Sequence, residues 1–115
     1  MDKINPIILT DEDTGEKFTL EFSRATVKFA ESKGFVLGEV GDFPLSRLPD
    51  LFFYAFRMHH QNVARSRTDT ILEDMGGLSK EVIERLGQLY MATLQSIIRI
   101  DEDEQPKNLK VTVEL

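Results

Sequence analysis

The sequence contains no cysteine, which excludes disulfide bonds, metal sites built from thiolates and cysteine nucleophiles. No apolar run approaches the roughly 20 residues that a membrane-spanning helix requires, and residues 1–6 lack the apolar core of a secretory signal. Positive charge is also scarce, because 14 Lys and Arg stand against 20 Asp and Glu, a formal net charge of −6. Such a chain repels phosphate. We therefore expect a soluble intracellular protein that binds neither nucleic acid nor membranes.

The composition that remains is typical of one folded domain. The chain has 115 residues, of which 41% are hydrophobic, too many for a disordered acidic tail and enough for a buried core. We predict the α+β class, with a small antiparallel sheet packed with about four α-helices. The expected order is an N-terminal hairpin over 1–22, a helical region over 23–100, an acidic linker over 101–108 and a C-terminal strand over 109–115.

Alternation of apolar and polar residues predicts the strands. Phe18, Leu20 and Phe22 share one face of a strand, and a polar turn over 11–16 joins it to a first strand over 7–9. Residues 109–115 alternate throughout, and we expect them to complete the sheet because a two-stranded hairpin alone is marginal. The alternative is that this last strand pairs with a neighbouring copy of the chain.

Capping residues and glycines mark the helices. Ser23 and Ser79 are N-cap residues, and Gly34 ends the first helix, with Phe35 folding back on its last turn. Pro49 is tolerated only in a first turn, so it fixes the start of the second helix. The spacing of Thr70 and Glu73 resembles a capping box for the third. The signals predict helices that begin at Ser23, Ser46, Thr68 and Ser79 and end at about Gly34, His60, Met75 and Ile100.

Three apolar residues lie off the apolar stripes of their helices. In the second helix, Phe53 and Tyr54 fall on the side opposite Leu51 and Phe56, and Met91 lies off the stripe of the last helix. Aromatic and methionine side chains are enriched at interfaces. We predict that Phe53, Tyr54 and Met91 contact a partner, with burial in a helical layer as the alternative.

An otherwise acidic chain contains one basic stretch. Residues 51–68 hold no Asp or Glu but include Arg57, Arg65 and Arg67. These arginines are candidates for docking an acidic partner segment or the chain's own acidic run over 101–104. The alternative is a helix end followed by a soluble loop, and three arginines are too few to bind nucleic acid.

The motif content argues against an enzyme. His59 and His60 are adjacent, so on a helix they point about 100° apart and cannot chelate one metal ion. The acidic turn over 11–16 lacks the glycine and glutamate positions of a calcium-binding loop. The chain has no phosphate-binding glycine loop and no hydrolase or zinc-protease motif. We predict no catalytic residues, no metal site and no cofactor.

The order of these elements resembles a known family of small proteins. The resemblance extends over nearly the whole chain and is carried by an N-terminal hairpin, one aromatic helix, a short helix closed by two glycines, and a long final helix followed by an alternating strand. The segments that carry it are Thr19–Arg24, Val27–Glu31, Leu51–Arg57 with His59 and His60, and Thr68–Ser79. This pattern is similar to the tail assembly chaperones of long-tailed phages and prophages of Gram-positive bacteria.

The resemblance implies a non-enzymatic role in the cytoplasm of the bacterial host. Such a chaperone keeps the long helical tape-measure protein soluble while tail-tube subunits polymerise around it. The implied partners are therefore the tape-measure protein and the tail-tube protein, with self-association of several copies along one client. The alternative function is a small acidic adaptor or regulatory protein that binds another protein.

Overall fold

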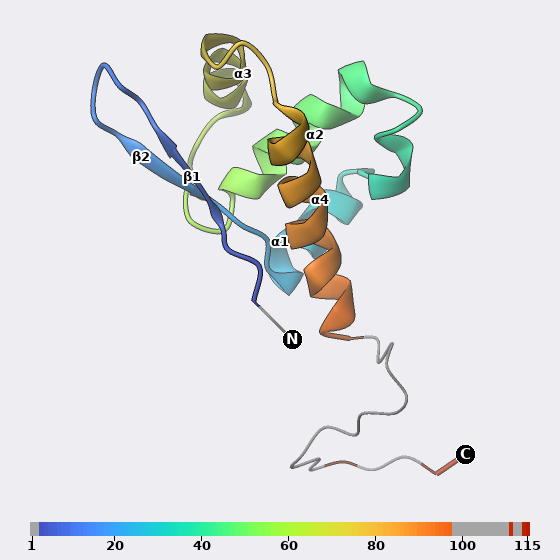
Figure 1. The fold of residues 1–115 in the computed structure, drawn as a ribbon. Coiled ribbons are helices and arrows are strands. Elements are labelled where there is room, and N and C mark those ends of the chain that lie inside the picture. Colours follow the sequence, from blue (N-terminus) through green and yellow to red (C-terminus); the bar gives the residue numbers. More distant parts are fainter. Residues whose placement is uncertain (1–2, 98–110, 112–113) are drawn as a thin grey trace.

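The computed structural model describes residues 3–97, 111 and 114–115 (Figure 1). In that part of the chain, a two-stranded antiparallel sheet packs with four α-helices, which confirms the predicted α+β class. The elements are β1 (Ile7–Thr10), β2 (Lys17–Leu20), α1 (Arg24–Ser32), the 3-10 turn η1 (Leu37–Glu39), α2 (Pro44–Phe56), α3 (Arg65–Asp74) and α4 (Lys80–Gln95). None of the described helices is both long enough and apolar enough to cross a membrane.

Helix α2 is the centre of the fold. It contacts α1, α3, α4, β2 and η1, and Figure 1 shows it crossing behind α4 and ending beside the hairpin. Four of its side chains are at most 1% exposed: Leu51, Phe52, Ala55 and Phe56. The Phe56 ring meets that of Phe18 on β2 edge to face, with ring centroids 5.5 Å apart. Burial of these aromatic side chains is the main apolar contribution to the core.

The N-terminal hairpin has the predicted inward face. Phe18 pairs with Leu9 and Leu20 with Ile7 across the strands, and Phe18, Leu20 and Phe22 are buried. The end of α2 and the turn after it bond to β2 and the residue that follows it. The Glu21 amide donates to the carbonyl of Ala55 at 3.0 Å, and the Thr19 amide donates to Nε2 of His60 at 2.9 Å. These two bonds join the hairpin to the helical layer.

The predicted caps of α1 and α4 are confirmed. Ser23 accepts a hydrogen bond from the Thr26 amide, and Ser79 accepts one from the Val82 amide. After α1, Gly34 has a φ of 88°, which lets the Phe35 amide donate back to the Ala30 carbonyl at 3.1 Å. Phe35 is thereby buried against the core, as expected for this type of helix ending.

The predicted boundaries of α2 are wrong at both ends. Pro44 occupies the first helical position, so the helix starts two residues before Ser46 and contains Pro49 in its interior. The amide that Pro49 lacks would bond to the carbonyl of Leu45, a residue that is 94% exposed, so water can satisfy that carbonyl. The helix ends at Phe56 because the chain turns there and brings His60 to β2.

Two further boundaries differ from prediction. Helix α3 begins at Arg65 rather than Thr68, and Thr70 is not its cap but donates from within the helix to the Ser66 carbonyl. Helix α4 ends at Gln95, not near Ile100, and Arg24 of α1 donates to the carbonyl and hydroxyl of Ser96 there. A cation on the last carbonyls stabilises a helix end at this point. The predicted acidic linker over 101–108 and most of the predicted strand over 109–115 lie outside the described residues.

Candidate partner-binding surface

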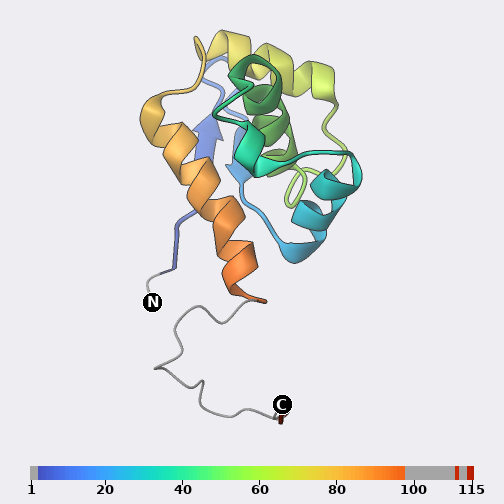
Figure 2. The same cartoon turned by 90° about the vertical axis from the view of Figure 1, so that its right-hand side faces the viewer.

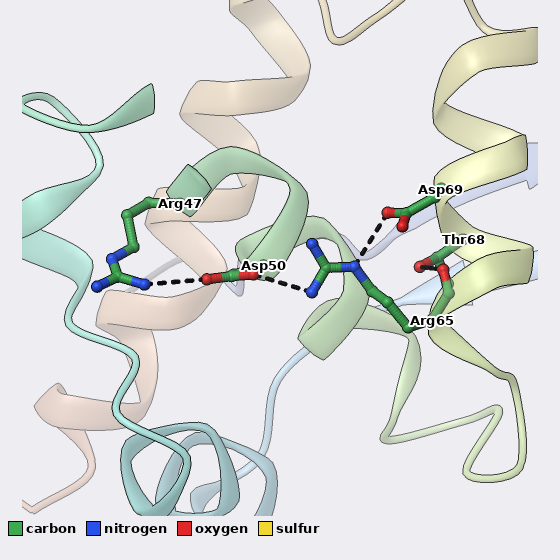
Figure 3. Close-up of polar contacts among 5 residues, drawn as sticks. All are labelled: Arg47, Asp50, Arg65, Thr68 and Asp69. Atoms are coloured by element: carbon green, nitrogen blue, oxygen red, sulfur yellow. Dashed lines mark hydrogen bonds and ion pairs between the residues drawn. The ribbon is translucent and has the colours of Figure 1, made fainter. Parts of the chain in front are cut away.

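The arginines of the basic stretch do not form one patch. Arg65 lies between two carboxylates, donating from Nη1 to Asp50 at 2.9 Å and from Nε to Asp69 at 3.0 Å. Asp50 also receives a hydrogen bond from Arg47 at 3.2 Å, so that one carboxylate joins α2 to α3 (Figure 3). The Arg65 cation is neutralised within its own chain.

The other two arginines are also used internally. Nη2 of Arg67 lies 3.4 Å from Oε1 of Glu16 and 3.7 Å from Oδ2 of Asp11, and both carboxylates belong to the hairpin turn. Arg57 stacks on Phe29 of α1, with its guanidinium carbon 3.6 Å from the ring centroid, a favourable cation–π arrangement. Each of these three arginines thus has a partner within the chain, and their docking of an acidic partner segment stays a prediction.

The structure places Tyr54 in the core. The side chain is 8% exposed, and its ring centroid lies 5.6 Å from that of Phe35 and 6.1 Å from that of Phe29. Burial, followed by the nearby charge of Asp50, raises the pKa of the Tyr54 phenol above its ordinary value. Helical periodicity correctly placed Tyr54 opposite the main stripe, but α1 covers that side of α2. Phe53 is half-buried beside it.

Of the three apolar residues predicted to contact a partner, Met91 is the most exposed. Its side chain is 44% exposed on α4. Three other residues lie on the same side of the helix at intervals of three and four positions: Ile83 and Gly87 before Met91, and Leu94 after it. All three are half-exposed, and neither Ile83 nor Leu94 is among the side chains that pack against the core. We name these four residues the α4 face.

Gly87 makes the α4 face flat at its centre. A Cβ atom built on Gly87 would meet no atom within 4 Å, so nothing in the described part of the chain requires a glycine there. Glycine in a helix interior is less favourable than alanine by roughly 1 kcal/mol. One physical use for such a residue is to let another backbone or side chain approach closely.

Sequence reasoning missed two strongly exposed apolar side chains at the start of α2. Phe43 and Leu45 are 58% and 94% exposed and flank Pro44 at the start of α2. In Figure 2, η1, the start of α2 and α4 all face the viewer, so the elements that carry these side chains lie on the side of α4. The sequence feature that could have indicated them is the apolar tripeptide over 43–45, which follows the loop that contains glycines 38 and 41 and belongs to no apolar stripe of a predicted helix.

A groove of about 550 Å³ lies on the other flank of α4. Its lining includes Met58, which is 42% exposed and follows α2, together with Ile4, Phe22, Leu89 and Ala92. Sequence analysis did not single out Met58, because it predicted that the second helix continued through that position. Apolar surface therefore occurs on both flanks of α4.

Both histidines have structural partners. Nε2 of His59 lies 2.8 Å from Oε1 of Glu21, and His60 accepts the Thr19 amide described above. Since Nε2 of His60 is an acceptor, its ring proton is on Nδ1 when the imidazole is neutral. Within residues 3–97, 111 and 114–115, no three side chains of His, Asp or Glu lie close enough to hold a metal ion.

The described residues form a small α+β fold that exposes apolar side chains on α4 and at the start of α2. The chain belongs to a protein family described as a domain of unknown function (DUF5055), which it matches over residues 1–115. No curated protein matches the chain, and neither does any solved structure.

Proposed function

We propose that this protein is a non-enzymatic chaperone of phage tail assembly that binds the tape-measure protein and keeps it soluble until tail-tube subunits enclose it. The proposal rests on the sequence resemblance, and the observation that supports it most is the α4 face. That face offers an adaptable methionine between two half-exposed aliphatic side chains, around a glycine.

The chemistry of the α4 face suits a helical client. An amphipathic helix presents apolar side chains at intervals of three and four residues, and Ile83, Gly87, Met91 and Leu94 repeat at the same intervals. Methionine packs against side chains of varied shape because it is unbranched and polarizable. The net charge of −6 would keep a chaperone–client complex dissolved.

Co-expression with the tape-measure protein of the same phage or prophage tests the function. We expect the client to accumulate in the soluble fraction only when this chain is present. Met91→Glu combined with Leu94→Glu should abolish that rescue, because two charges would be buried against the client. Gln61→Glu combined with Asn62→Glu is the matched control, since it adds the same charge at exposed positions outside α4.

The outcomes separate the function from the surface. A client that stays insoluble beside the wild-type chain contradicts the chaperone function. A second outcome is that the Met91 and Leu94 variant rescues the client with a fold that circular dichroism shows to be unchanged. That result would agree with the chaperone function but would exclude the α4 face as the surface that binds the client. Client binding without any gain in solubility would favour the adaptor alternative.

A further inference from the structure

A second groove lies at the opposite end of the molecule from the end of α4. It has a volume of about 520 Å³ and is formed by β1, the hairpin turn and the C-terminal part of α3, which neighbour one another at the upper left of Figure 1. Its apolar lining comes from both sides of the gap: Leu9, Phe18, Ile71 and Met75. Met75 is 38% exposed, so an apolar side chain entering the groove would find contact surface that the chain itself leaves open.

The rim of this groove is acidic. It carries four carboxylates: Asp11, Glu12, Asp13 and Asp74. The Asp11 carboxylate already has partners within the chain. It accepts hydrogen bonds from the backbone amides of Asp13 and Thr14 and faces the Arg67 guanidinium. Those backbone hydrogen bonds, together with the Arg67 charge, hold the pKa of Asp11 below its ordinary value.

No other described residue supplies a cationic partner for the remaining three rim carboxylates. Within the described ranges, no Lys, Arg or His lies within 4.0 Å of Glu12, Asp13 or Asp74. All three residues are exposed. The groove therefore presents uncompensated negative charge around an apolar floor, and a ligand that complements it has positive charge around an apolar centre.

The spacing of the carboxylates decides between two cationic ligands. A bound metal ion requires several oxygen ligands that converge on one point, and among the residues that the structure describes no such group occurs. A peptide segment has no such requirement, because each Lys or Arg reaches one carboxylate on a flexible stem that also packs on apolar surface. The arrangement consequently favours a segment over an ion.

We propose that this acidic groove binds a basic amphipathic segment of a partner protein. A large apolar side chain of that segment packs against Met75 and Ile71, and flanking Lys or Arg side chains face Glu12, Asp13 and Asp74. The inference does not depend on the proposed function, since it uses neither the α4 face nor the tape-measure protein. The groove and the α4 face have no residue in common.

Three labelled model peptides of equal length test the proposal with the full-length chain. One alternates blocks of lysine and leucine, the second replaces every lysine by glutamate, and the third replaces every leucine by serine. Fluorescence anisotropy at low and at physiological salt measures their binding. We expect the lysine–leucine peptide to bind more tightly than either of the others, because it alone supplies both features of the groove.

Matched variants then locate the site. Glu12→Gln, Asp13→Asn and Asp74→Asn together should weaken binding of the lysine–leucine peptide by about 3- to 100-fold, since each exposed ion pair contributes about 0.2–1 kcal/mol. The control neutralises three exposed carboxylates elsewhere, Asp42→Asn, Glu81→Gln and Glu84→Gln, and changes the net charge by the same amount. It should leave the affinity nearly unchanged.

Met75→Ser tests the apolar floor and should weaken binding of the lysine–leucine peptide without altering the weaker binding of the lysine–serine peptide. Equal weakening by the rim and control variants would overturn the proposal, because it would reduce the binding to attraction by net charge. Equal binding of all three peptides would overturn it as well. Because all substituted side chains except Met75 are exposed carboxylates, thermal unfolding should show that the rim and control variants stay folded.

Discussion

Replacing Gly87 by alanine adds one methyl group at the centre of α4, in a space where no neighbouring atom lies within 4 Å. The substitution therefore introduces no clash and removes no packing. The remaining effect is on the conformational entropy of the backbone, because alanine loses less conformational freedom than glycine on entering a helix. We expect Gly87→Ala to raise the free energy of unfolding by about 0.5–1 kcal/mol.

Urea denaturation followed by circular dichroism at 222 nm measures this change, and the melting temperature should rise by about 2–6 °C. Gly34→Ala is the matched control. Its Cβ would also meet nothing within 4 Å, but Gly34 has a φ of +88°, a conformation that costs an L-residue about 1–2 kcal/mol. The same chemical change should thus stabilise at position 87 and destabilise at position 34.

A loss of stability in Gly87→Ala would refute the reasoning, since it would mean that the methyl group meets atoms that the structure places elsewhere. The same variant also reports on the proposed function. If a client helix packs closely on the α4 face, the added methyl group obstructs it, and Gly87→Ala should recover less soluble client while being the more stable protein. A purely structural role for position 87 would not separate stability from client binding in this way.

Three other predictions concern contacts within the fold. Burial raises the pKa of Tyr90 to about 12 and also raises the pKa of Tyr54. Absorbance at 295 nm should therefore show both phenols ionising above pH 10 in the native protein and near pH 10 in denaturant. Because the unfolded chain loses these protons first, the free energy of unfolding should fall as the pH rises from 10 towards 12. His60→Ala removes the acceptor of a β2 amide and should destabilise by about 1–2 kcal/mol, with faster hydrogen exchange in the hairpin. A double-mutant cycle with Asp50→Asn and Arg65→Gln should give a coupling of about 0.5–1 kcal/mol that shrinks in 1 M salt, since both groups are partly exposed.

Local signals predicted the parts of the fold that depend on local chemistry. The alternation around Phe18 predicted the hairpin, Ser23 and Ser79 predicted two helix starts, and Gly34 with Phe35 predicted a helix end. The helix starts and the helix end depend on hydrogen bonds or backbone angles of residues within about five positions in the sequence, and the hairpin pairs residues 7 to 13 positions apart. Such features are fixed before the elements pack together.

The features that sequence missed depend on packing between distant elements. Tyr54 looked like a surface residue because periodicity shows which side of a helix a residue occupies, but not that α1 returns to cover that side. The end of α2 at Phe56 depends on the bond between His60 and Thr19, 41 residues apart in the sequence. Pro49 is tolerated within the helix because the carbonyl it leaves unpaired belongs to an exposed residue, which no local rule reveals.

The same limitation applied to the charges, because ion pairs between elements distant in the sequence are not visible in the sequence. From sequence, the stretch that contains Arg57, Arg65 and Arg67 was the distinctive charged feature of an acidic chain and suggested an acidic partner. In the structure, Arg65 and Arg67 are paired with carboxylates of the chain and Arg57 covers an aromatic ring, so little positive charge from this stretch is left to attract a ligand. Among the described residues, the rim of the acidic groove carries three carboxylates, Glu12, Asp13 and Asp74, for which no ion pair is formed. A partner that approaches this surface meets carboxylates and apolar side chains, and electrostatic steering therefore favours a segment that is basic and amphipathic.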